Sequence, residues 1–164
     1  MILGLPTLVF IHVLISLLGI ASGFVILAGF LGDKRFDGSN AFFLVTTILT
    51  SLSGFILPAH KILPSHVLGV LSLIALAIAC VARYAKKMQG GWRKTYVISA
   101  MFSFYFNIFV LVAQSFMKVP ALHALAPQGS EPPFAIAQAV VLLAFAGFTV
   151  RAVRKFRSAA SATA

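Results

Sequence analysis

Four histidines are the side chains in this sequence best suited to chemistry, because neutral imidazole binds metal ions and haem iron and exchanges protons near neutral pH. They are His12, His60, His66 and His123. His12 lies inside a long apolar segment, where a polar ring needs a hydrogen bond or a ligand. His12, His60 and His66 are therefore candidate metal ligands, and two histidines on facing helices could hold a haem iron axially.

Three side-chain amides also lie within apolar segments, where an unpaired amide is costly to bury. Asn107 and Gln114 share one polar face of a predicted helix, within roughly 80° of arc at about 100° per residue. The sequence predicts one outward-facing polar site, whose candidate cofactor-binding residues are His12, His60, Asn107, Gln114 and Gln138. Its candidate occupants are a haem, a transition metal and a small quinone-like ligand.

Acidic residues are scarce, which excludes several other functions. The sequence has three, Asp33, Asp37 and Glu131, and none lies in an apolar segment. A transporter that uses membrane carboxylates, or a site for Ca²⁺ or Mg²⁺, would lack its ligands. The sequence also lacks a phosphate-binding loop, a dinucleotide fingerprint and a Ser/His/Asp triad motif. These observations argue against an enzyme.

Five apolar segments must position the candidate site. Hydrophobic residues make up 60% of the 164 and charged residues 10%, and about 20 apolar residues in a helix cross a bilayer core of ~30 Å. Backbone groups in lipid need internal hydrogen bonds, so we expect helices. The sequence thus predicts an all-α integral membrane bundle, one domain over residues 1–157, and a disordered tail over 158–164. The expected spans are 5–31, 41–57, 65–84, 95–117 and 134–150, the last being the shortest, with a short surface helix near 120–126.

Basic residues give the expected orientation. The formal net charge is +10, and the Lys and Arg residues flank apolar spans, where they favour the cytoplasmic side and anionic lipid headgroups rather than nucleic acid. The residues that follow the first, third and fifth spans are Lys34, Arg35, Arg83, Lys86, Lys87, Arg93, Lys94, Arg151, Arg154, Lys155 and Arg157. The other side carries Lys61 and Lys118. We therefore expect the N-terminus outside and the C-terminus in the cytoplasm.

Small residues support a different interpretation of the polar faces. Gly19 and Gly23 form a GxxxG pattern in the first span, and such residues let helices approach closely while Ser and Thr bond across the interface. The chain could therefore be a non-catalytic assembly subunit that packs against another membrane protein or against copies of itself. A small transporter is a third possibility.

Several motifs resemble those of a known group of proteins. They are YFNIFVLVAQSF at 105–116, KVPALHALAP at 118–127 and EPPF at 131–134, with TSLSGF at 50–55 and ARY at 82–84. They resemble small polytopic inner-membrane proteins of proteobacteria, which implies a multi-pass protein of the bacterial inner membrane but no particular activity. A looser likeness, carried by histidines at helix ends, links the chain to membrane bundles that bind b-type haem.

Overall fold

The computed structural model describes residues 6–57 and 64–157, and its long elements are all helices. Helix α1 covers Thr7–Leu31, α2 Asp37–Ile56, α3 Pro64–Cys80, the π-helical turn η1 Val81–Ala85, α4 Trp92–Lys118, α5 Pro120–His123 and α6 Pro132–Lys155. Five segments of this described part are long and apolar enough to cross a membrane: Thr7–Leu31, Asp37–Ile56, Ser65–Ala85, Trp92–Lys118 and Pro132–Lys155. The all-helical fold and its five predicted spans are confirmed.

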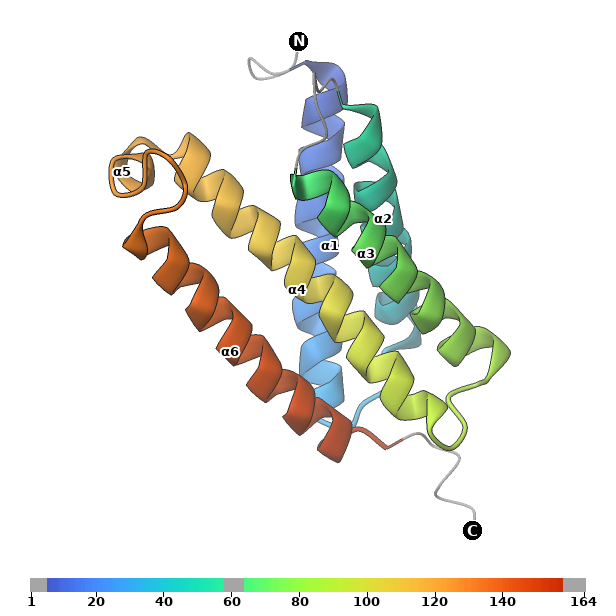
Figure 1. The fold of residues 1–164 in the computed structure, drawn as a ribbon. Coiled ribbons are helices and arrows are strands. Elements are labelled where there is room, and N and C mark those ends of the chain that lie inside the picture. Colours follow the sequence, from blue (N-terminus) through green and yellow to red (C-terminus); the bar gives the residue numbers. More distant parts are fainter. Residues whose placement is uncertain (1–5, 58–63, 158–164) are drawn as a thin grey trace.

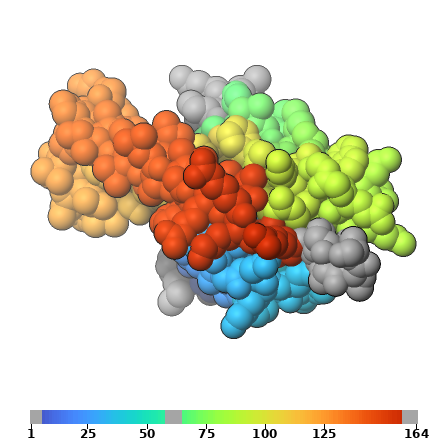
Figure 2. Space-filling model, turned by 90° about the horizontal axis from the view of Figure 1, so that it is seen from below, coloured from blue at the N-terminus to red at the C-terminus, as the bar shows by residue number. Residues whose placement is uncertain are grey.

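The long helices alternate in direction, so that most of the basic residues gather at one end of the bundle (Figure 1). This basic end is where α1, η1 and α6 finish and where α2 and α4 begin. The other end, named here the cavity end, holds the start of α1, the end of α4 and the short helix α5. Figure 2, a view of the basic end, shows the last residues of α6 lying beside the turn between α1 and α2.

Helix α4 is the centre of the bundle and α6 lies at its edge. Half of the most apolar stretch of α4 is buried, against 6% of that of α6. Helix α4 contacts α1, α2, α3 and α6, whereas α6 contacts α4 and α1. Towards the cavity end, α4, α5 and α6 lean away from the other three helices (Figure 1).

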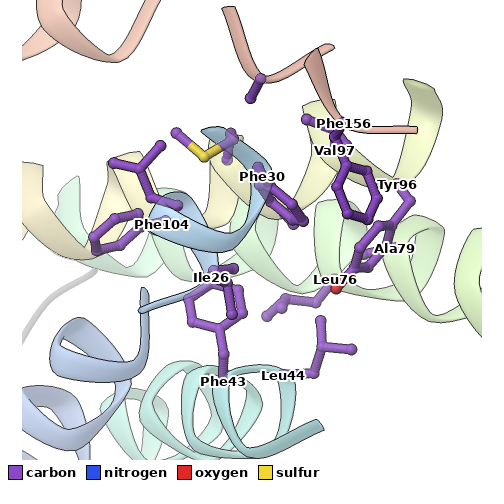
Figure 3. Packing of buried hydrophobic residues seen from close by; sticks show 14 of the residues in the cluster. Ile26, Phe30, Phe43, Leu44, Leu76, Ala79, Tyr96, Val97, Phe104 and Phe156 are labelled. Carbon is purple, nitrogen blue, oxygen red and sulfur yellow. The ribbon is translucent and has the colours of Figure 1, made fainter. Parts of the chain in front are cut away.

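Aromatic rings fill the half of the bundle near the basic end. Phe30 packs edge-on against Tyr96, with ring centroids 5.8 Å apart, and against Phe156 at 5.0 Å. Figure 3 shows these rings beside Val97, with Leu76 and Ala79 nearby. Because this half is closely packed, it provides a rigid base for the more open half at the cavity end.

A glycine allows α1 to approach α4 closely. A Cβ atom on Gly23 would lie 2.5 Å from the ring of Phe104. That ring is fully buried and packs edge-on against Phe24, Phe43 and Phe145. The helices can cross here only because residue 23 has no side chain.

A buried arginine joins three helices at the basic end. The side chain of Arg83, in η1, is 6% exposed and donates to the carboxylate of Asp37 at the start of α2. Its guanidinium also lies 5.2 Å from the ring centroid of Tyr96, whose hydroxyl donates to Asn40. In the sequence, Arg83 indicates only which side of the membrane its end of the span faces. The structure adds a packing role, because a buried guanidinium needs such partners.

Two ends of the spanning segments differ from the prediction by four residues or more. Helix α2 begins at Asp37 rather than at residue 41. Helix α6 continues to Lys155, so the prediction that the last span is the shortest is wrong: α6 has 24 residues and α2 has 20.

The end of α6 is capped by Arg93, which donates to the carbonyl oxygens of Val153, at 3.1 Å, and Phe156. The predicted tail at 158–164 lies outside the described residues.

Candidate functional site

A cavity of about 520 Å³ opens between α1, α2, α3 and α4 at the cavity end. Volumes of this size are typical of small-molecule sites. Its walls are mostly apolar, and the polar or glycine positions on them are His12, Ser16, Thr50, Ser51, Gly54, Ser65, His66, Gly69, Ser72, Asn107, Gln114, Ser115 and Lys118. The cavity thus combines an apolar interior with a limited set of hydrogen-bonding groups.

His12 is half-buried on the α1 wall, and its ring is hydrogen-bonded to α2. Its Nδ1 lies 2.7 Å from the hydroxyl oxygen of Ser53, and that hydroxyl donates its proton to the carbonyl of Thr50 at 3.1 Å. A hydroxyl has one proton to give, so in the tautomer in which Nδ1 donates to Ser53, the Ser53 proton goes to Thr50. The other ring nitrogen, Nε2, then keeps its lone pair and can accept a hydrogen bond or bind a metal ion.

The α4 wall carries two amides, two turns apart on one face. Asn107 donates through Nδ2 to the hydroxyl of Thr47 at 3.4 Å, close to where α4 passes Gly19 of α1. Gln114 lies two turns further along, about 10 Å at 1.5 Å per residue. His12 is equally far from Gly19 on α1, so His12 and Gln114 lie at one depth on the two walls.

Buried serines of α2, α3 and α4 meet at the cavity. The hydroxyl of Ser51 donates to Ser72 at 3.3 Å. The hydroxyl of Ser103 donates to the carbonyl of Ser99 at 3.1 Å and lies 3.5 Å from the carbonyl of Ser72. The neighbouring hydroxyl of Thr50 is buried and has no hydrogen-bond partner among the residues that the structure describes. These serines close the floor, and they match the interhelical packing role that the sequence suggests for small hydroxyl residues.

The charge on the cavity walls is cationic. Lys118, the last residue of α4, lines the cavity, and no aspartate or glutamate does so among residues 6–57 and 64–157. The ring of His66, at the start of α3, stacks on Phe55 with centroids 5.6 Å apart. A cationic ligand would therefore meet no compensating charge on these walls, whereas a neutral or anionic one is accommodated.

The structure brings together four of the six predicted site residues: His12, His66, Asn107 and Gln114 line this cavity. Gln138 is placed elsewhere, because it is buried between α6 and α4, where its Nε2 donates to the carbonyl of Phe109 at 3.1 Å. His60 lies outside the described residues.

No metal centre is apparent in the described part of the chain, where no three His, Cys, Asp or Glu side chains are grouped so that they could hold an ion. The predicted ligand set of His12, His60 and His66 includes one residue that lies outside the described ranges. Comparison of the chain with protein-family models, with curated proteins and with solved structures found no match.

Sequence reasoning missed the hydrogen-bond partner of His12 and the charged residue of the cavity. The sequence predicts only a general packing role for Ser and Thr residues such as Ser53, because its role as the partner of His12 depends on how α2 is rotated against α1. Lys118 was counted only as a loop charge, although α4 includes it and its side chain reaches the cavity wall. Lys118 lies four residues, or about one helical turn, after Gln114, and this spacing predicts that both side chains share one face of α4.

Proposed function

We propose that this chain is a multi-pass protein of the bacterial inner membrane and that it binds a small quinone-like ligand in the cavity between α1 and α4. The observation that carries the proposal is the convergence of His12, Asn107 and Gln114 on one mostly apolar cavity of about 520 Å³. The membrane location is supported by five long apolar helices, and the inner membrane by the resemblance of the 105–134 motifs.

The chemistry of the lining matches a quinone and its hydroquinone. The amides of Asn107 and Gln114 can donate hydrogen bonds to a quinone carbonyl, and Nε2 of His12 can accept one from a hydroquinone hydroxyl. The apolar walls suit an uncharged ring. A haem or a transition metal remains the rival occupant, because the same lone pair on Nε2 of His12 would suit a metal ion.

Binding of a water-soluble dimethoxy-methyl-benzoquinone and of its hydroquinone to the purified protein in lipid nanodiscs tests the proposal. Loss of one hydrogen bond is worth about 0.5–1.5 kcal/mol, or roughly a twofold to tenfold rise in Kd. We expect His12→Phe to cause such a rise mainly for the hydroquinone and Gln114→Leu mainly for the quinone. Matched changes away from the cavity, His123→Phe and Gln138→Leu, should leave both affinities unchanged.

Two results would overturn the proposal. One is that neither probe binds saturably, or that His12→Phe and His123→Phe lose the same affinity for the hydroquinone. The other is a visible absorption band of haem, or a stoichiometric metal content, that disappears in His12→Phe and persists in His123→Phe. The second result would replace the quinone by a haem or a metal at the same residues.

A further inference from the structure

Helices α1 and α4, which form two walls of the cavity, diverge towards the cavity end (Figure 1). Helices α1 and α4 meet near Gly23 and Phe104, and Gly19 lies close to Asn107. Beyond that crossing, α4 leans away from α1 towards the cavity end (Figure 1). The stretches of α1 and α4 beyond the crossing, from Val9 to Leu17 and from Val110 to Lys118, both line the cavity.

Apolar residues of both helices are exposed along this divergence, and Gln114 and Lys118 are exposed towards the end of α4. Val13 and Leu17 on α1 are 37% and 49% exposed, and Leu111 on α4 is 38% exposed, while all three line the cavity. Leu17 lies ten residues into α1, about 15 Å from the start of the helix, which is near the middle of a ~30 Å hydrocarbon layer. An opening between two spanning helices at that depth faces lipid chains rather than water.

We infer that the ligand enters sideways from the bilayer, and that it carries a hydrocarbon chain lying between α1 and α4 while its polar head meets His12 and Gln114. This inference rests on the proposed function and narrows its ligand class to membrane-dissolved quinones with a chain. The apolar side chains of Val13, Leu17 and Leu111 match a chain, whereas a water-soluble ligand would need no such path. His12 is half-buried, whereas Val13, Leu17 and Leu111 are exposed, so the head at His12 lies next to the path of the chain.

A bulky ring placed in the path separates chain binding from head binding. Leu17→Trp should raise the Kd of the decyl derivative of the benzoquinone about tenfold. It should leave the Kd of the chain-free benzoquinone within about twofold, since no head contact is removed. Leu14→Trp is the matched control, because Leu14 is 47% exposed on the same helix and does not line the cavity. Leu111→Trp makes the same test from the α4 side.

The remaining outcomes would overturn either the lateral path or the proposed function, and they can be told apart. Unchanged affinity for the decyl probe in both Leu17→Trp and Leu111→Trp would overturn the lateral path. Loss of both probes in these variants, with normal thermal unfolding, would show that these positions contact the head and would equally overturn the chain placement. In either case the proposed function would stand. Failure of the unmodified protein to bind any probe would instead overturn the proposed function itself.

Discussion

Replacing Gly23 by alanine tests whether α1 and α4 cross as closely as the structure shows. The new Cβ atom would lie 2.5 Å from the Phe104 ring, well inside van der Waals contact. That ring cannot rotate away easily, because Phe24, Phe43 and Phe145 pack against it at centroid distances of 5.1, 6.1 and 5.0 Å. Overpacking of this kind costs about 1–3 kcal/mol, only partly offset by the ~1 kcal/mol that alanine gains over glycine in a helix.

Gly19→Ala is the matched control, one turn away on the same face. A Cβ atom there would lie 3.4 Å from the Thr46 hydroxyl and 3.5 Å from that of Thr47, so the neighbours need to give little. We expect Gly19→Ala to be neutral or slightly stabilising and Gly23→Ala to lower the stability. The measurement is the free energy of unfolding in mixed detergent micelles. If Gly23→Ala is as stable as Gly19→Ala, the helices do not meet at this contact and the cavity geometry is wrong.

Three further predictions concern charged groups and topology. Asp37→Ala removes the carboxylate partner of buried Arg83 and should lower the free energy of unfolding by about 1–3 kcal/mol, a range that already allows for water around the exposed carboxylate. The control is Arg35→Ala: the Arg35 guanidinium lies 3.5 Å from the Asp37 carboxylate, and its loss should cost less than about 0.5 kcal/mol in the same unfolding assay. Cysteines introduced at Lys87 and Gly129 should react with an impermeant reagent from opposite sides of the membrane, with Gly129 accessible from outside; labelling of both from one side would refute the predicted topology. The carboxylate of Glu131 accepts backbone N–H bonds from Gln128 and Ser130, each at 3.0 Å, which holds its pKa below the ordinary 4.5. The contribution of these bonds to loop stability is therefore present above pH 4.5 and lost as the pH falls through the lowered pKa. An NMR titration of the Glu131 carboxyl should show a midpoint below pH 4.5. A midpoint at or above pH 4.5 would contradict these bonds.

The five spans were predictable because the width of a bilayer and the need to pair every backbone group leave few alternatives. The 3.6-residue period likewise indicated which residues share a helix face. Counting residues from the helix ends placed His12 and Gln114 at one depth, and in the structure both line the same cavity. Periodicity and rise along one helix thus carry information about depth and face.

The contacts between helices were not predictable in the same way. Gln138 has a depth suited to the cavity, but the rotation of α6 turns it to the carbonyl of Phe109 instead. Arg93 was assigned to membrane orientation, yet it caps a helix end some 60 residues later in the chain. Helix α6 therefore extends beyond the point where its hydropathy falls. Each of these contacts depends on the azimuth of one helix against another, which a single sequence does not encode locally.

The unequal burial of α4 and α6 determines where this chain tolerates variation. Ile136, Val140 and Leu143 of α6 are more than half exposed, and in a bilayer such positions contact lipid chains that accept any apolar shape. Exchange among Leu, Ile, Val and Phe there leaves the fold intact. On α4, by contrast, Val97 and Phe104 are fully buried against several helices. Drift in sequence should therefore accumulate on α6 and spare α4, so that relatives with the same architecture could retain similarity in little more than the central helix.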